Sequence, residues 1–297
     1  MTSSTSFYDW LGFSCAYEIH KPTVVNHNKP ALLLLHPIGV GLSRLFWQRF
    51  GDAWLKTGLG NALYNPDLLG CGDSAMPYFA YYPEDWAEQL GYFVQTVVKT
   101  PVILVCQGAL LPVGIALVEK RPELIKGLIF SGPPAWRLIS EDKQSLQQRL
   151  AWNLFASPFG NAFYRYARRR QFLQSFSIRQ LFAASEAVDE EWLNTLKEGS
   201  QNLASRHAVF SFLSGFWRQD YSQSIAQINQ PTLVVMGKQA SSISREGFTE
   251  TPAQRLEAYL KHFPNSEGKQ ISGRNVLPYE STLEFAKVVS QFVELIN

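Results

Sequence analysis

Short apolar runs alternate along this chain with longer segments in which apolar residues recur at helical spacing. The apolar runs end at turn residues, which is typical of strands buried in a sheet. Strands that alternate with helices indicate a parallel sheet built from βαβ units. Strands are predicted at residues 7–13, 14–20, 31–35, 61–64, 101–107, 125–130, 232–236 and 269–272, and helices at residues 45–57, 82–99, 254–263 and 280–296, with a further helix that ends at Lys120.

The pattern changes between Pro134 and about Asn229. No strand pattern occurs there, and helical segments rich in aromatic residues dominate, as in residues 150–173. A helical insertion of this length between two strands indicates a cap over the sheet. We therefore expect a core made of residues 1–134 and 230–297, and a helical cap made of residues 135–229.

Composition and charge are those of a globular protein. Of the 297 residues, 46% are hydrophobic and 18% are charged, and the net charge of +2 gives no reason to expect binding to nucleic acid. The longest apolar stretch, residues 104–118, is shorter than a membrane span and contains Gln107, Gly108 and Pro112. The N-terminus lacks the basic and apolar regions of a signal peptide.

The cysteines and histidines follow no spacing typical of a metal site. Cys15, Cys71 and Cys106 are odd in number and far apart, and the histidines form no ligand pattern with them. The sequence therefore predicts no metal and no cofactor. A reduced, cytoplasmic setting is expected.

Four stretches, in this order along the chain, together resemble the α/β-hydrolase superfamily. ALLLLHPIGVGLSRLFW (31–47) is similar to the strand and oxyanion loop of that family, and NPDLLGCGDSAMP (65–77) to its loop after the fourth strand. PVILVCQGALLPVGIALVEKRPE (101–123) resembles the strand and helix around the nucleophile. PTLVVMGKQA (231–240) resembles the strand that leads into the acid loop.

This resemblance implies an α/β fold with a mostly parallel central sheet flanked by helices. It also implies that the all-helical cap is inserted after the sixth strand. The capped architecture is similar to that of esterases, haloalkane dehalogenases and pheophytinase-like enzymes. Kinship with hydrolase-like proteins of cyanobacteria and plastids is expected as well.

In this family the nucleophile is the central serine of a G-x-S-x-G turn between a strand and a helix. That turn is represented here by CQGAL (106–110), so Gly108 occupies the serine position. No serine occurs between Pro101 and Pro112. A residue at the tip of such a turn is held at positive φ, at a cost of about 1–3 kcal/mol. Glycine avoids this strain because it has no Cβ.

The other two catalytic positions also hold residues that cannot do the chemistry. By the same resemblance, the acid position falls on Ala240 and the histidine position on Val276. The chain has no aspartate after Asp220 and no histidine after His262. Losing all three groups removes nucleophile, base and orienting acid together. Hydrolysis by the usual triad is therefore not expected.

The resemblance also points to pocket residues. The oxyanion hole of the family consists of backbone N–H groups, which here would belong to Ile38 and Ala109. Two interpretations are possible: the oxyanion hole still binds a carbonyl group or an anion, or it no longer binds anything. Gln107 either shapes the pocket floor or is a buried amide with its hydrogen bonds satisfied, and Gly108 is a further pocket candidate. His36 is expected at the carboxyl edge of the sheet, where open α/β folds place ligands. His36 acts either as a general base or through a structural hydrogen bond.

Two hypotheses for function follow. In the first, the protein is non-hydrolytic and binds an apolar ligand or a protein partner through its pocket and cap. In the second, it is an enzyme, a hydrolase or lyase, with a non-standard catalytic set around His36, to which Cys106 or Asp73 contributes. Cys106 lies inside a buried strand, where cysteine behaves as a small hydrophobe, and this favours the first hypothesis.

The first part of the cap is basic. Residues 135–179 contain eight Lys or Arg and two acidic residues, with Arg168, Arg169 and Arg170 adjacent. Basic charge beside apolar side chains suits peripheral contact with an anionic membrane surface or an acidic partner. The alternative is a cap whose aromatic residues cover the pocket while its arginines are solvated.

Overall fold

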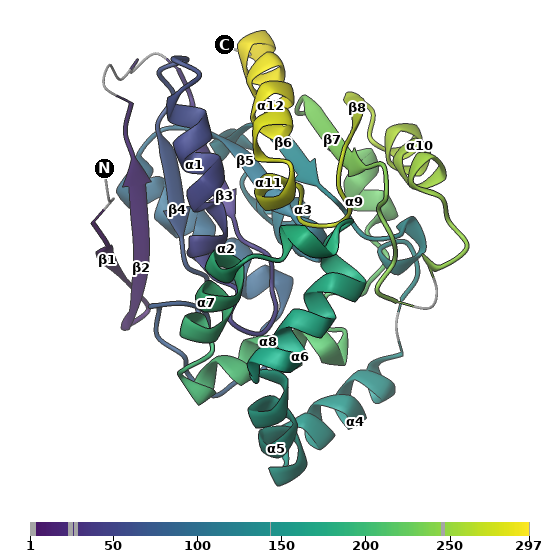
Figure 1. Ribbon diagram of the computed structural model, residues 1–297. Helices are drawn as coiled ribbons and strands as arrows, with labels where there is room; N and C mark the ends of the chain where they lie inside the picture. Colours follow the sequence, from purple (N-terminus) through teal and green to yellow (C-terminus); the bar gives the residue numbers. More distant parts are fainter. Residues whose placement is uncertain (1–3, 23–25, 27–28, 143, 245–246, 297) are drawn as a thin grey trace.

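The computed structural model describes residues 4–22, 26, 29–142, 144–244 and 247–296. Its strands form one sheet in the order β1-β2-β4-β3-β5-β6-β7-β8 (Figure 1). The β1–β2 and β2–β4 pairs are antiparallel, and all the other pairs are parallel. The mostly parallel sheet predicted from the sequence is thus confirmed. The strands are Ser6–Trp10 (β1), Phe13–His20 (β2), Ala31–Leu35 (β3), Leu63–Pro66 (β4), Val102–Gln107 (β5), Ile125–Ser131 (β6), Thr232–Gly237 (β7) and Ser266–Ile271 (β8).

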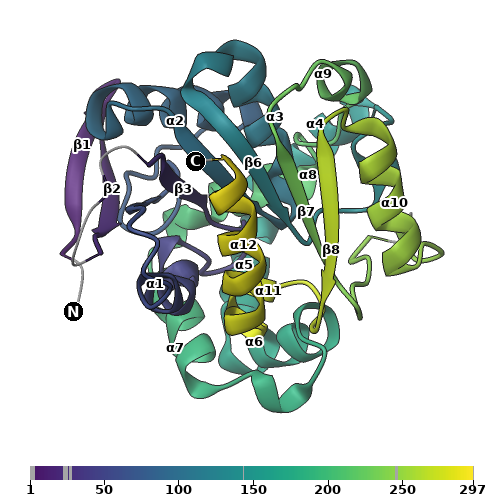
Figure 2. The ribbon, with the colours of Figure 1, turned by 90° about the horizontal axis from the view of Figure 1, so that it is seen from above.

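The central strands are buried on both faces, because successive side chains of a strand point to opposite sides of the sheet. In β5, Leu104 and Cys106 belong to one hydrophobic cluster, whereas Ile103 and Val105 belong to another. Helices pack on both faces of the sheet (Figure 2). They are α2 (Pro83–Phe93), α3 (Leu111–Lys120) and α10 (Pro252–His262) on the first, and α1 (Gln48–Leu55), α11 (Leu277–Glu280) and α12 (Thr282–Ile296) on the second.

The described residues between β6 and β7 form helices and loops only, as the sequence predicts. α4 to α8 lie together beyond one end of the sheet (Figure 1). The short helix α9 instead contacts α3 and α10, so it lies with the core helices. The division into core and cap at residue 229 stays a prediction. These helices are α4 (Ser145–Ala156), α5 (Pro158–Ala167), α6 (Arg170–Phe176), α7 (Glu190–Gly199), α8 (Arg206–Ser214) and α9 (Ser222–Ala226).

The end of α7 lies very close to the loop that follows β3. Gly41 has a φ of +79°, and a Cβ on it would lie 1.9 Å from the carbonyl oxygen of Leu196. A Cβ on Gly199 would lie 2.3 Å from the carbonyl oxygen of Gly41. The two backbones can approach this closely because both positions lack a side chain.

Several predicted boundaries differ from the structure. The strand predicted at 7–13 ends at Trp10, because Leu11 and Gly12 both have positive φ and form the turn of a hairpin. The strand predicted at 61–64 lies at Leu63–Pro66, and the one predicted at 269–272 already begins at Ser266. The helix predicted at 82–99 is α-helical only to Phe93 and continues as a π-helical turn.

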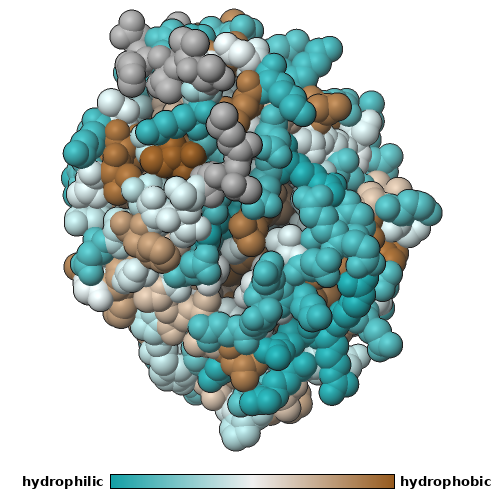
Figure 3. Space-filling view, turned by 60° about the vertical axis from the view of Figure 1, so that its left-hand side comes forward, coloured by the Kyte–Doolittle hydropathy of each residue, from teal (hydrophilic) through white to brown (hydrophobic). Residues whose placement is uncertain are grey.

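The face that carries the N-terminal strands is largely polar. Hydrophobic residues form small separate groups among hydrophilic ones in this view (Figure 3). Scattered surface hydrophobes of this kind are ordinary in globular proteins.

Candidate functional site

A cavity of about 440 Å³ lies between the carboxyl ends of the strands and the cap. Loops that follow β3, β5, β6, β7 and β8 contribute to it, because the carboxyl ends of parallel strands meet at one edge of a sheet. Helices α5, α6, α7 and α8 of the cap close it from the other side. The cap side is apolar, with Phe163, Phe172, Leu173, Leu196 and Val209 in the wall.

Gly108 occupies the tip of a sharp turn between β5 and α3 and lines the cavity. Its φ is +64°, so the strained conformation expected for this turn is present. No atom lies within 4 Å of the position that its Cβ would take. A side chain at this position would therefore project into open space, as a nucleophile must.

The two other positions assigned to a triad differ in placement. Val276 is buried, precedes α11 and lines the cavity together with Gly108. Ala240, just after β7, is buried but is not among the lining residues, whereas the next residue, Ser241, is.

Asn275 ties the loops around the cavity together, and sequence reasoning did not single it out. Its carbonyl oxygen accepts a hydrogen bond of 2.7 Å from Nε2 of Gln107 at the end of β5. Its Nδ2 donates to the carbonyl oxygens of Gln180 (2.7 Å) and Ser241 (3.0 Å). Its backbone N–H donates to the carbonyl oxygen of Leu181 at 3.0 Å. One residue thus connects the turn at Gly108, the loop after β7 and the cap.

Ile38 and Ala109, whose N–H groups were expected to form an oxyanion hole, both line the cavity. Ala109 lies in the 3-10 turn Gly108–Leu110 that opens into α3. The first N–H groups of a helical segment have no intrahelical acceptor. Gln107 also lines the cavity, and its Oε1 is buried without a hydrogen-bond partner among the described residues.

His36, predicted as a pocket residue, does not line the cavity. It is fully buried, its Nδ1 lies 2.8 Å from the carbonyl oxygen of Pro37, and its Nε2 accepts from the N–H of Leu68 at 3.1 Å. Nδ1 is therefore the donor of the ring. Burial lowers the pKa of His36, despite the charge of Asp67 nearby. Both ring nitrogens form contacts that hold two loops together. His36 therefore has a structural role, and the prediction that it lines the pocket is wrong.

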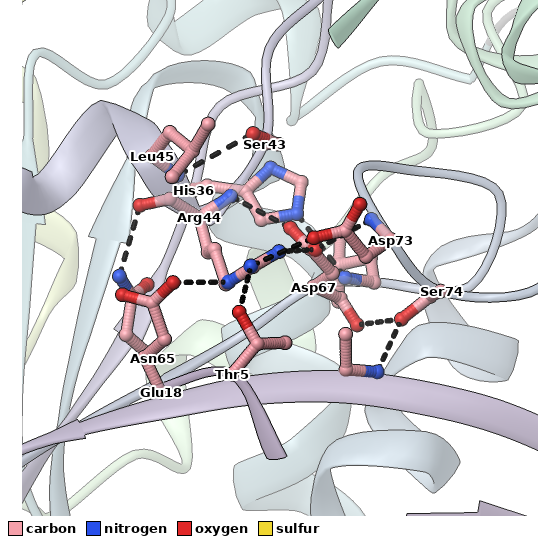
Figure 4. Close-up of polar contacts among 12 residues, drawn as sticks. Thr5, Glu18, His36, Ser43, Arg44, Leu45, Asn65, Asp67, Asp73 and Ser74 are labelled. Atoms are coloured by element: carbon pink, nitrogen blue, oxygen red, sulfur yellow. Dashed lines mark hydrogen bonds and ion pairs between the residues drawn. The ribbon is translucent and has the colours of Figure 1, made fainter. Parts of the chain in front are cut away.

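Beside His36, a buried cluster of charges surrounds Arg44 (Figure 4). Its guanidinium donates to Asp67, to Glu18 at 3.0 Å and to Asp73 at 2.8 Å. Asp67 also accepts from the backbone N–H groups of Arg44 (2.7 Å) and Asp73 (2.8 Å). Burial would lower the pKa of Arg44, but the carboxylates outweigh this and raise it. Asp73, considered above as a catalytic residue, thus belongs to an ion cluster that joins the N-terminal strands to the loop after β4.

Cys106 is equally remote from catalysis. Its side chain is buried in the sheet beneath α3, and it is not among the lining residues. Burial raises the pKa of its thiol far above the ordinary value. A thiol without access to the cavity and without a thiolate form does not act as a nucleophile.

The charged residues of the cavity wall were missed by sequence reasoning. They are Arg218 and Arg255, and the described lining residues include no histidine, no cysteine and no carboxylate. Arg255 lies on α10, in the segment that the sequence identifies only as an amphipathic helix. Arg255 and Tyr259 are four residues apart, so they lie on the same face of α10, and Tyr259 is buried. This spacing could have indicated that Arg255 is buried as well.

The arginines of the cap mostly bind within the protein. Arg168 donates to the carbonyl oxygens of Ser200 and Gln201, at 3.1 Å each, and Arg170 forms an ion pair with Glu190. Arg169 lies over the ring of Tyr166.

A feature that the sequence analysis missed is a row of exposed leucines on α4. It consists of Leu146, Leu150 and Leu154, with exposed fractions of 66%, 61% and 53%.

Neither a metal-binding group nor a membrane-spanning helix occurs among the described residues. No group of three or more His, Cys, Asp or Glu is placed to hold a metal ion. None of the helices in this part of the chain is long and apolar enough to span a bilayer.

Comparison with known proteins places this geometry in a wider context. The model of the alpha/beta hydrolase family matches residues 32–288. No curated protein matches the chain.

Solved structures resemble the chain over almost its full length. An esterase from Thermogutta terrifontis, with malate bound, has a TM-score of 0.72 at 18% identity and covers 100% of this chain and 99% of its own. A serine hydrolase involved in carbazole degradation has a TM-score of 0.75 at 17% identity, with coverage of 99% and 100%. The haloalkane dehalogenase DatA from Agrobacterium tumefaciens C58 has a TM-score of 0.72 at 15% identity, with coverage of 99% and 97%. At these identities, the likeness concerns the fold.

Proposed function

The chain belongs to the alpha/beta hydrolase family, and from this premise we propose that it is a non-hydrolytic member that binds an apolar small molecule in its cavity. The observation that carries the proposal is the composition of the cavity wall. The wall is mainly apolar, and its described residues include serines but no histidine, cysteine or carboxylate. A volume of about 440 Å³ lies within the range of small-molecule sites, which is about 300–1,000 Å³.

Acyl transfer by this fold needs a nucleophile, a histidine that takes its proton and an acid that orients the histidine. Gly108 is at the tip of the turn, and Val276, to which the family resemblance assigns the histidine position, lines the same cavity. The serines of the wall have no neighbouring base on the wall to activate them. An enzyme built around His36 is disfavoured, because both ring nitrogens of His36 are bonded and the ring is not on the wall.

Of the two kinds of partner considered from the sequence, the cavity favours a small molecule over a protein. A protein partner needs an extended surface, whereas this wall surrounds a cavity of about 440 Å³ between the strand ends and the cap. The location of the protein in the cell and its lineage stay predictions.

Binding can be tested with a neutral fluorescent probe, N-phenyl-1-naphthylamine, whose emission rises in apolar surroundings. We expect saturable binding to the purified protein. Ala109→Trp, which places an indole in the cavity, should weaken binding by at least about tenfold. Ala226→Trp, at an exposed position on α9, is the matched control and should leave binding unchanged. Absence of saturable binding by the wild type would refute the proposal.

Hydrolysis is tested in parallel with p-nitrophenyl esters of short and long acyl chains. We expect no turnover above buffer for the wild type or for Gly108→Ser, because the variant restores a hydroxyl but no base. Turnover by the wild type that Ala109→Trp abolishes would show that the cavity is an active site after all.

A further inference from the structure

Arg255 is a buried cation in the wall of an apolar cavity. Only 2% of its surface is exposed, and the residue lines the cavity. Burying a charge is costly unless hydrogen bonds and an opposite charge compensate for it. The partners of this guanidinium therefore decide what the site can bind.

Two nitrogens of Arg255, Nε and Nη2, are buried without a hydrogen-bond partner among the described residues. These two atoms form one edge of the planar guanidinium and point their N–H bonds in parallel. Such an edge matches the two oxygens of a carboxylate, which binds arginine through a pair of parallel hydrogen bonds. The unsatisfied part of Arg255 thus has the shape of a carboxylate site.

The nearby carboxylate of this chain does not fill that site. Oε2 of Glu250 lies 3.6 Å from Nε of Arg255, which is too far for a hydrogen bond, and Oε2 has no hydrogen-bond partner of its own. The side chain of Glu250 is 26% exposed, and Glu250 does not line the cavity. Glu250 therefore forms an ion pair with Arg255 that offsets part of its charge but leaves the Nε–Nη2 edge without hydrogen bonds.

The rest of the wall suits the remainder of an amphiphile. No described lining residue is acidic. Away from the arginines, the wall is formed by aromatic and aliphatic residues of the cap. They include Phe163, Phe172, Leu173, Phe176, Leu181 and Leu196.

We propose that the ligand of the cavity is a long-chain carboxylate, whose head group binds the Nε–Nη2 edge of Arg255 and whose chain lies against the cap. This inference rests on the proposed binding function and names the class of ligand. It also accounts for a buried arginine whose Nε and Nη2 have no hydrogen-bond partner among the described residues.

The test compares dodecanoate with dodecan-1-ol, which has the same chain and a neutral head. Each is titrated, below its micelle-forming concentration, against the full-length protein loaded with N-phenyl-1-naphthylamine. We expect dodecanoate to displace the probe at a concentration at least about tenfold lower than dodecan-1-ol, because hydrogen bonds between charged groups are stronger than those of a hydroxyl.

Variants identify the residue responsible. Arg255→Met should remove the preference for dodecanoate and leave the affinity for dodecan-1-ol within about twofold. Arg121→Met, an exposed arginine at the end of α3, is the matched control and should retain the preference. Glu250→Gln removes the competing carboxylate and should raise the affinity for dodecanoate about threefold or more, without changing that for the alcohol.

The outcomes separate this inference from the proposed function. If the wild type binds the probe and both amphiphiles equally well, the cavity binds apolar molecules but the assignment of Arg255 is wrong. If the probe itself does not bind, both proposals fail. If Arg255→Met does not fold, the wild-type preference and the gain in Glu250→Gln decide the matter, and the absence of either overturns the inference.

Discussion

Glycine-to-alanine substitutions at three positive-φ positions should differ in cost according to what surrounds each one. Gly108 has a φ of +64° and Gly58 a φ of +73°, and neither has an atom within 4 Å of its Cβ position. At these two positions alanine lowers the unfolding free energy only through its left-handed backbone conformation, by about 1–2 kcal/mol. Alanine also makes the unfolded chain less flexible, which raises the unfolding free energy by about 0.4–1 kcal/mol. Gly41 has a similar φ of +79°, but its Cβ would lie 1.9 Å from the carbonyl oxygen of Leu196. Backbone must then shift, which adds about 1–3 kcal/mol.

The expected losses of unfolding free energy are therefore about 1 kcal/mol for Gly108→Ala and Gly58→Ala, and about 2–4 kcal/mol for Gly41→Ala. Urea unfolding, followed by tryptophan fluorescence and far-ultraviolet circular dichroism, measures them, and coincident transitions establish that the comparison is valid. If Gly41→Ala cost no more than Gly58→Ala, the tight packing of α7 against the loop after β3 would be refuted. If Gly108→Ala cost much more than Gly58→Ala, the space in front of the turn would not be open.

Other predictions address the ion cluster, two buried side chains and the cap. Arg44→Met leaves buried carboxylates unpaired and should lower the unfolding free energy by about 3–5 kcal/mol in urea titrations. Burial and a neighbouring positive charge lower the pKa of His207 to about 4, so the unfolded chain takes up a proton first as the pH falls from about 6.5 to 4. Stability should fall through that window by at most about 1.4 kcal/mol per pH unit, and the slope should be shallower in His207→Phe. Cys106 should react with iodoacetamide no faster than the protein unfolds, as mass spectrometry of labelled peptides can show. If the cap meets a membrane through α4, Leu150→Glu should reduce sedimentation with anionic vesicles. Leu295→Glu, at an even more exposed position near the end of α12, should not.

The sheet could be predicted because its central strands carry their signal locally. Residues 31–35 and 102–106 are apolar throughout, which is typical of a strand buried on both faces. Boundaries were less predictable where backbone conformation decides them. β1 ends where Leu11 has a positive φ. Positive φ is uncommon for leucine, so the sequence gives no sign of a turn at this residue.

The residues of the cavity wall were only partly predictable, because a wall depends on contacts between distant segments. Gly108, Ala109, Ile38 and Val276 were found through the order of motifs along the chain. Arg255 was not, since an arginine in an amphipathic helix is usually on the solvent side. Its burial becomes visible only once α10 packs against the sheet.

If the protein is non-hydrolytic, as we propose, the hydrogen bonds of Asn275 explain how its cavity can persist without a catalytic triad. In an active enzyme, hydrogen bonds from acid to histidine to serine join three loops that come from different strands. Here the same loops are joined by Asn275, which binds Gln107 at one strand end, Ser241 after another, and Gln180 and Leu181 in the cap. These bonds involve backbone carbonyl and N–H groups, so they do not depend on nucleophile, base or acid. The loops around the cavity are thus held together without the hydrogen bonds of a triad, as the proposed binding function requires.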